Sequence, residues 1–199
     1  MATVLFADVV GFTPMTARHL PEEMFEIIQP ALEMFVNVID HYGGKIAAFG
    51  GDSVMALFGV PTEQPDDAVR AVRAALEIQA NVAPYARELK QDKGIDFSVR
   101  VGLDTGVVAL GRIGGEQRAE FTALGDAVNL AFRLQQDQAQ PGTVVISGHT
   151  YQQVRGRFRT ESLGRVRVKG KFWPVKVYRV LGERVKSASV RESRRAKSN

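Results

Sequence analysis

The chain has 199 residues, of which 45% are hydrophobic and 24% charged, and it contains no cysteine. This composition is typical of a globular protein with a sizeable core, and the lack of cysteine excludes disulfides, thiolate nucleophiles and cysteine-based zinc sites. No apolar run approaches the roughly 20 residues that a membrane-spanning helix needs, and the apolar start lacks a basic leader, so we expect a cytoplasmic protein without a signal peptide or membrane contact.

The formal net charge of +4 comes from the C-terminal end. Residues 183–199 carry six Lys or Arg and two Asp or Glu, so residues 1–182 carry 20 charges of each sign. The sequence therefore predicts a neutral domain over 1–182 and a basic tail over 183–199, which is poor in large apolar groups and which we expect to be disordered. A solvated tail is favoured over one that binds acidic lipid or nucleic acid, and the neutral domain argues against a nucleic-acid-binding protein.

The first half of the chain alternates apolar runs with helical patterns. β-Forming apolar runs indicate strands, and Pro21, followed by two glutamates and by apolar residues at helical spacing, indicates the start of a helix. The predicted elements are a strand over 3–9, a helix from Pro21 that stops at 41–44, a hairpin with strands near 45–49 and 53–59, and a second helix over 68–90.

The second half is richer in strands. Ser147 is a side chain suited to capping a short helix that runs through Val154. The other predicted elements are a strand over 95–106 with 107–114 as its hairpin partner, a polar loop over 114–122 that runs into a short strand, a helix over 125–138, a strand over 142–147, and the last strands within 158–181.

The order strand, helix, strand, strand, helix, strand predicts an α+β fold with a ferredoxin-like βαββαβ core and C-terminal additions. Such a core has an antiparallel-rich sheet with helices on one face. The first strand then lies beside the hairpin, so the end of that strand can face the hairpin turn.

Two carboxylates are expected to meet at this edge. Asp8 closes the first strand, and Asp52 lies at the tip of the hairpin. Unpaired carboxylates at close range repel each other, and hard divalent cations bound to oxygen ligands and phosphates relieve that repulsion. Either residue alone is better explained as a surface acid, but the pair, with glycines beside both, favours a metal site.

The segment that follows Asp8 is suited to phosphate oxygens. Gly11 permits a tight turn, and Phe12 and Thr13 can offer backbone N–H groups at a helix start. The alternative is an ordinary connection between a strand and a helix.

A second polar group lies on the predicted helix over 125–138. Asn129 and Arg133 are four residues apart and share one helix face among apolar neighbours. Arginine matches phosphate geometry, although an ion pair with a nearby carboxylate explains Arg133 equally well. Lys169 lies beside Gly170, where a lysine could reach a terminal phosphate or simply point into water.

These motifs together resemble the catalytic domain of class III nucleotidyl cyclases, which have a palm-like fold. FADVVGFT, GGDSVMALFG, TALGDAVNLAFRL and VKGK occur in the family's order, and the similarity covers about residues 2–181. The resemblance implies a head-to-tail homodimer with active sites at its interface. One chain would supply the metal ligands Asp8, Asp52 and the Val9 carbonyl, and the other would supply Asn129, Arg133 and Lys169.

The implied activity is that of an adenylate cyclase, which converts ATP to 3′,5′-cyclic AMP and pyrophosphate with two Mg²⁺ or Mn²⁺ ions. The ribose 3′-OH attacks the α-phosphorus in line, while Arg133 meets the charge that develops at the leaving group. His19, His41 and His149 all fall outside the motifs, so we expect them to be structural.

The base-reading positions depart from the family pattern. Ala48 stands where adenylate cyclases usually have Lys and guanylate cyclases Glu, and neither role is open to alanine. Lys45 is three residues earlier, so strand alternation places it on the other face unless a bulge intervenes. Thr122 takes the second base-reading position, where its hydroxyl can donate or accept. Thr122 and the surrounding FTALGD resemble bacterial adenylate cyclases, so ATP is the expected substrate. Because Ala48 cannot contact the base, we expect weak discrimination against GTP.

Three alternatives stay open. Ala48 would suit a catalytically weak cyclase-homology module that binds nucleotide or regulates a partner, and it leaves a guanylate cyclase possible. The GGD hairpin is also typical of diguanylate cyclases, but GGDSV lacks the acidic residue that usually follows the aspartate in those enzymes.

Because the chain starts close to the first catalytic strand, we expect a regulatory domain in a longer parent chain.

Overall fold

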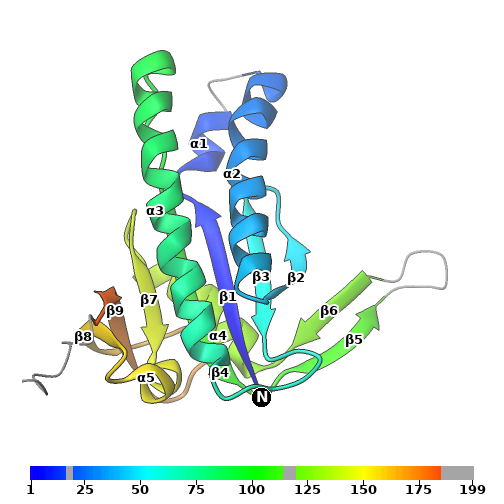
Figure 1. The fold of residues 1–199 in the computed structure, drawn as a ribbon, viewed down its shortest axis with the longest axis vertical. Coiled ribbons are helices and arrows are strands. Elements are labelled where there is room, and N and C mark those ends of the chain that lie inside the picture. Colours follow the sequence, from blue (N-terminus) through cyan, green and yellow to red (C-terminus); the bar gives the residue numbers. More distant parts are fainter. Residues whose placement is uncertain (17–19, 114–119, 185–199) are drawn as a thin grey trace, which may run out of the picture.

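The computed structural model describes residues 1–16, 20–113 and 120–184. The predicted tail beyond Arg184 lies outside the described residues. A seven-stranded sheet in the order β2-β3-β1-β4-β7-β9-β8 forms the centre of the molecule, and β5 and β6 form a separate two-stranded sheet beside it (Figure 1).

The elements follow the predicted order with small shifts at their ends. They are β1 (Ala2–Val9), α1 (Phe12–Thr16), α2 (Pro21–His41), β2 (Lys45–Phe49), β3 (Ser53–Phe58), α3 (Asp67–Lys93), β4 (Val99–Gly106), β5 (Ala109–Ile113), β6 (Glu120–Leu124), α4 (Asp126–Arg133), the π-helix η1 (Leu134–Gln138), β7 (Val144–Ser147), α5 (Gly148–Val154), β8 (Phe158–Val166) and β9 (Val175–Glu183).

The first four strands of the sheet confirm the ferredoxin-like prediction. β1 lies between β3 and β4 and is antiparallel to both. Among the described strands, β2 pairs with β3 alone, so β2 forms one edge of the sheet. The additions extend this core, because β7 runs parallel to β4 and is followed by β9 and β8. The first strand therefore lies beside the hairpin, as the sequence predicts.

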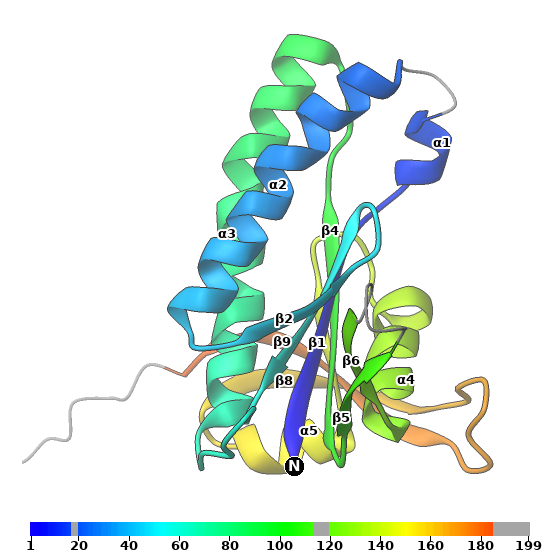
Figure 2. The same ribbon diagram turned by 90° about the vertical axis from the view of Figure 1, so that its right-hand side faces the viewer.

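Alternation along β1 divides the core between the two faces of the sheet. Leu5 packs with apolar residues of α2 and α3, whereas Val4 packs with Ala127 and Ala131 of α4. Figure 2 shows α2 and α3 on one side of the sheet and α4 on the other. The two core helices share one face, as predicted, and α4 is the addition that covers the opposite face.

The predicted hairpin between 95–106 and 107–114 is wrong. β5 pairs with β6 through the register Ala109↔Leu124 to Ile113↔Glu120, and β4 pairs instead with β1 and β7. Both long edges of β4 are already occupied, so the chain leaves the sheet after Gly106 and forms a separate two-stranded arm.

The predicted helix over 125–138 consists of two consecutive helical segments, α4 and η1, which together we call the α4–η1 rod. It is α-helical through Arg133 and then widens into η1. This rod lies close to β4 because Gly102 has no side chain: a Cβ there would meet the Gln135 nitrogen at 2.3 Å and the Ala131 oxygen at 2.6 Å.

The cap predicted for the short helix is confirmed. The Ser147 hydroxyl oxygen accepts a hydrogen bond from the Thr150 N–H at 3.2 Å, and α5 ends at Val154. One of the orphan N–H groups of the first turn is thereby satisfied.

Candidate active site

Asp8 and Asp52 come together at one end of the sheet. Asp8 lies opposite Ser53 in the β1–β3 register, and the Val9 N–H donates to the Asp52 carbonyl at 3.2 Å. The turn that presents Asp52 requires glycine, because Gly51 has a φ of +78°. The backbone pairing thus fixes the relative position of the two carboxylates.

The carboxylate pair is electrostatically suited to a cation. Burial, and next the negative charge of Asp8, raise the pKa of Asp52 above its ordinary value, while Arg100 only partly opposes this effect. No group of three or more acidic or histidine side chains suited to a metal occurs in the described part of the chain. Two carboxylates with the Val9 backbone between them therefore form a candidate donor set for hard divalent ions.

Arg100 and Gln135 hold Asp8 from one side. Arg100 on β4 donates to Asp8 Oδ2 from Nε at 3.0 Å and from Nη2 at 2.9 Å, and Gln135 Nε2 donates to the same oxygen at 2.9 Å. Within the described part of the chain, the side chains that donate to this carboxylate all donate to Oδ2. The carboxylate is therefore oriented by its own chain, with Oδ1 left for another ligand.

Neither positioning residue follows from the motifs. The signal for Arg100 was present in the sequence, because an antiparallel pairing of 3–9 with 95–106 sets Arg100 opposite Asp8. Gln135 had no comparable signal, since its contact depends on how the 125–138 helix lies across the sheet.

The predicted phosphate loop begins directly after β1. Gly11 has a φ of +72°, and the Met15 N–H donates to the Gly11 carbonyl as α1 starts at Phe12. Phe12 is partly buried against the core. The backbone of Thr13 lies in the first turn of α1, and its side chain is outside the described residues.

Asn129, Arg133 and Lys169 line a second cavity. Its volume is about 270 Å³, and Lys171 contributes a further cation. Its described lining includes neither Asp8 nor Asp52. The structure therefore brings the predicted ribose and phosphate ligands together, but apart from the carboxylate pair.

Internal partners hold this second cavity in shape. Lys171 Nζ contacts Asp126 Oδ2 at the start of α4, and Arg133 donates to the Gln136 side chain at 3.1 Å. Arg133 also lies 5.6 Å from the Phe132 ring centroid, a cation–π contact. Lys171, which the sequence reasoning did not single out, is thus nearer to an acidic partner than Lys169, which is exposed.

A bulge changes which side of the sheet Lys45 faces. Lys45 lies opposite Leu57 and Ala48 lies opposite Met55, with a register shift between Ile46 and Ala48. Leu57 and Met55 are two residues apart and belong to one apolar cluster on the α4 face. The expected alternation is therefore wrong here, and Lys45 lies on the same face as Ala48.

The other base-reading position is on the separate arm. Thr122 of β6 lies opposite Gly111 of β5. Its side chain is outside the described residues. The two predicted base-reading positions therefore come from β2 and from the arm.

Asp104, a buried acid on β4, lies outside the described lining of the cavity that holds Asn129 and Arg133. Asp104 is 1% exposed, burial raises its pKa, and it accepts a hydrogen bond from Ser147. His149 Nδ1 lies 3.3 Å from the same carboxylate but is 64% exposed. Because Ser147 and Asp104 are buried and the Ser147 oxygen also caps α5, these two residues form a polar network within the core.

Comparisons with known proteins agree on one family. The sequence profile of the adenylate and guanylate cyclase catalytic domain matches residues 1–186. Adenylate cyclase 1 of Rhizobium meliloti is 30% identical over 181 residues, which are 90% of this chain and 27% of that protein. The chain thus spans about a quarter of that relative's length.

Solved structures of both nucleotide specificities share the fold. The adenylyl cyclase CyaB from P. aeruginosa has a TM-score of 0.87 and 30% identity, covering 92% of this chain and 94% of CyaB. The guanylate cyclase domain of RhGC from Catenaria anguillulae, solved in complex with GTP, has a TM-score of 0.83 and 29% identity, covering 92% and 97%. Over the residues described, none of the helices combines the length and apolar character that crossing a membrane demands.

Proposed function

The chain belongs to the family of adenylate and guanylate cyclase catalytic domains, and on that premise we propose that it is an adenylate cyclase that forms cyclic AMP and pyrophosphate from ATP. The observation that carries the proposal is the convergence of Asp8 and Asp52, with Asp8 held in place by hydrogen bonds from Arg100 and Gln135. The adenylate cyclase relative and the CyaB structure support ATP as the substrate.

We assign the carboxylate pair and the cavity lined by Asn129 and Arg133 to the two halves of one shared site. Asp8, Asp52 and the Val9 carbonyl of one copy would hold the metal ions, with Gly11, Phe12 and Thr13 at the phosphates. Asn129 and Arg133 of a second copy would orient the ribose and neutralise the charge at the leaving pyrophosphate. Asp8 and Asp52 are not in the described lining of the cavity that holds Asn129 and Arg133, and this separation within one chain supports a site shared across a head-to-tail homodimer.

Divalent ions held by the carboxylates would lower the pKa of the ribose hydroxyl and neutralise the phosphates. The residues of the chain do the rest. Arg100 keeps Asp8 fixed before substrate arrives, so little reorganisation is needed during the reaction. Lys169 and Lys171 add positive charge beside Arg133, where the triphosphate would lie.

Base selection is the part of the site that departs from the family. Ala48 has no polar group, but the bulge sets Lys45 on the same face two strand positions away. We propose that Lys45 supplies the cation for the adenine ring in place of the residue at 48, with Thr122 as the second base contact. A charged hydrogen bond such as that from Lys45 contributes about 1.5–3 kcal/mol, so we expect ATP to be preferred over GTP by about 10- to 100-fold.

Guanylate cyclase activity is the second candidate, because the RhGC domain shares the fold and was solved with GTP. The decisive assay supplies purified protein with Mg²⁺ or Mn²⁺ and either ATP or GTP, and identifies the cyclic products by mass. Cyclic AMP as the main product supports the proposal. A strong GTP preference contradicts the assignment of substrate, and no product from either nucleotide favours a non-catalytic nucleotide-binding module.

Mixing two inactive variants tests the shared site. Asp52→Ala removes one half and Arg133→Ala the other, so each homodimer is expected to be inactive. Mixed dimers regain one intact site, and activity returns to about a quarter of the wild-type value at equal mixing, because half of the dimers are mixed and each has one of two sites. If mixed dimers form, as shown by two affinity tags, and no activity returns, the shared-site proposal is wrong.

A further inference from the structure

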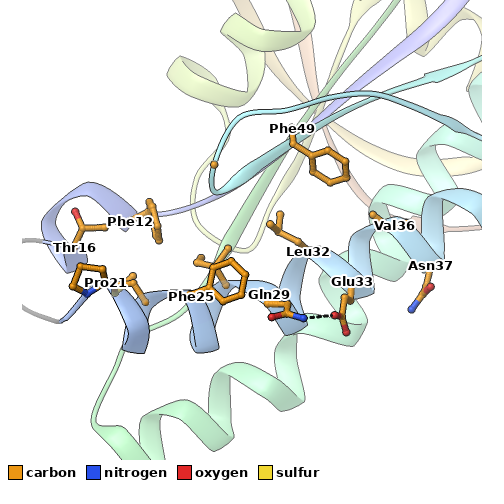
Figure 3. A pocket seen from close by; sticks show the side chains of 13 residues that line it. Phe12, Thr16, Pro21, Phe25, Gln29, Leu32, Glu33, Val36, Asn37 and Phe49 are labelled. Atoms are coloured by element: carbon orange, nitrogen blue, oxygen red, sulfur yellow. Dashed lines mark hydrogen bonds between the residues drawn. The ribbon is translucent and has the colours of Figure 1, made fainter. Parts of the chain in front are cut away.

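An apolar groove opens beside the candidate metal site. It has a volume of about 800 Å³ and lies between α1, α2 and the β2–β3 hairpin, with Phe25 and Phe49 on its walls (Figure 3). These two phenylalanines are 67% and 59% exposed. Phe12 and Gly51 also line the groove, so one end of it adjoins the residues next to Asp8 and Asp52.

An exposed aromatic pair lies in the connection between β8 and β9. Phe172 is 89% exposed and Trp173 is 75% exposed, and their rings pack edge to face at 4.9 Å between centroids. The pair follows Lys169 and Lys171, which line the second cavity with Asn129 and Arg133. Two large neighbouring aromatic residues that are this exposed indicate a surface covered by a partner.

The two surfaces are complementary in charge as well as in polarity. The connection and its flanks carry only positive charges, at Arg165, Arg167, Lys169, Lys171 and Lys176. Helix α2 carries five carboxylates and no Lys or Arg over residues 21–41, and Glu33 lines the groove itself. Opposite charges around an apolar contact steer association and fix its register.

The aromatic pair does not fill the groove of its own chain. Figures 1 and 2 show the hairpin tip and α1 toward one end of the molecule and the β8–β9 connection toward the other. A shared active site, however, brings Lys169 of one copy to the phosphates held beside Phe12 of the other. Phe172 is only three residues beyond Lys169, so it would arrive at the mouth of the partner's groove.

We propose that Phe172 and Trp173 of each copy insert into the groove between α1, α2 and the β2–β3 hairpin of a second copy. The inference rests on the proposed homodimer, and it names the contact that aligns the two halves of the site. Because the arrangement is isologous, the same contact forms twice in each dimer. The aromatic pair then acts as an anchor outside the chemistry, and the lysines before it are delivered to the triphosphate.

Cross-linking tests the contact directly, because the native chain contains no cysteine. Trp173→Cys and Phe25→Cys are made in chains with different tags, mixed and oxidised. The proposal predicts a covalent dimer that carries both tags, and no comparable product from either variant alone. Leu110→Cys, at an exposed position of the β5–β6 arm, is the matched control and is mixed with Phe25→Cys in the same way. If Leu110→Cys cross-links to Phe25→Cys and Trp173→Cys does not, the arm fills the groove and the proposal is wrong.

The strength of the contact is measured by sedimentation over a range of protein concentrations. The double variant Phe172→Ala/Trp173→Ala is expected to raise the dimer dissociation constant about 30-fold or more, the loss typical of an interface hot spot. Phe25→Ala is expected to raise it comparably, and adding it to the double variant adds little. Leu181→Ala, which removes a 51%-exposed leucine from β9, is the control and leaves it unchanged.

The outcomes separate this inference from the proposed function. If the double variant is a weak dimer whose cyclase activity returns at high protein concentration, the inference holds. If it dimerises like the wild type, the inference is wrong whatever the activity. If it dimerises normally but loses binding to phosphatidylserine-containing vesicles, the aromatic pair contacts membranes instead, which also overturns the inference. A cross-linked dimer without cyclase activity leaves the contact intact and contradicts only the function.

Discussion

At the scale of single residues, the carboxylate pair is an electrostatically unfavourable arrangement in the metal-free chain. The pairing of β1 with β3 forces Asp52 toward Asp8, and both burial and the charge of Asp8 raise the pKa of Asp52. Only part of that repulsion is relieved by Arg100 within the chain. Residues kept in such an unfavourable arrangement are typical of functional sites.

Replacing Asp52→Asn therefore stabilises the metal-free protein. We expect a gain on the order of 1 kcal/mol, because the repulsion from Asp8 disappears while the size of the side chain is kept. The melting temperature then rises by roughly 2–4 °C. Mg²⁺ or Mn²⁺ raises the melting temperature of the wild type by mass action and has little effect on the variant.

Thermal unfolding with and without each ion provides this measurement. Asp92→Asn, at an exposed position of α3, is the matched control and responds to the ions as the wild type does. An Asp52→Asn protein that is stabilised by the ions as much as the wild type contradicts the assignment of the metal site.

Lys45 carries a second prediction at this scale. If it contacts the adenine ring, Lys45→Ala removes a charged hydrogen bond, which contributes about 1.5–3 kcal/mol. We expect kcat/KM for ATP to fall about 10- to 100-fold while the value for GTP changes much less. Steady-state kinetics with both nucleotides measure the ratio. Lys90→Ala on α3 is the control, and an equal fall with both nucleotides would show that Lys45 does not read the base.

At the scale of elements, most of the fold and the meeting of Asp8 with Asp52 could be predicted from local sequence patterns and the order of the strands. The apolar run of β1, the face of α2 and the glycine turn before Asp52 are local signals, and the βαββαβ order then fixed that β1 lies beside β3. The meeting of Asp8 with Asp52 follows from that topology alone. The Ser147 cap was equally local, since it depends on the residues directly after a strand.

The errors came from contacts that no local pattern encodes. β5 looked like the partner of β4, but the edges of β4 are taken by β1 and β7, which lie far away in sequence. The bulge between Ile46 and Ala48 reversed the face of Lys45 without a glycine or proline to indicate it. Gln135 reaches Asp8 only because the α4–η1 rod lies across β4.

That close approach of α4 and η1 to β4 gives a sharp prediction. Gly102→Ala would place a Cβ 2.3 Å from the Gln135 nitrogen and 2.6 Å from the Ala131 oxygen, both backbone atoms that move only with the helix. We expect a destabilisation of about 3 kcal/mol, at the upper end for overpacking, and a melting temperature lower by roughly 6–12 °C. The shift of η1 also draws Gln135 away from Asp8, so activity falls at temperatures where the variant is folded.

Gly111→Ala is the matched control for this variant. It lies in a strand as well, but a Cβ there would meet no atom within 4 Å. Its free energy of unfolding should stay within about 0.5 kcal/mol of the wild type. A Gly102→Ala protein as stable as the Gly111→Ala protein would show that the rod can move off the sheet without loss.

At the scale of the whole molecule, the proposed function divides the chain into two half-sites, each completed by a second copy. The carboxylates and the phosphate loop lie where β1 and the hairpin end, whereas Asn129 and Arg133 line a cavity with the β8–β9 connection. The α4–η1 rod joins them, because Gln135 holds Asp8 two residues after Arg133. In a homodimer, one rigid element would therefore contribute to both active sites.

This division makes the dependence of activity on protein concentration diagnostic. Well below the dimer dissociation constant, the amount of dimer rises with the square of the total protein, so a logarithmic plot of rate against concentration should have a slope near two. The slope should fall to one above that constant. A dimer cross-linked through Trp173→Cys and Phe25→Cys cannot dissociate, so its specific activity should stay constant on dilution. A slope of one at concentrations where sedimentation finds only monomer would mean that a single copy completes the site, and the division of labour between Asp8 and Arg133 of different copies would be wrong.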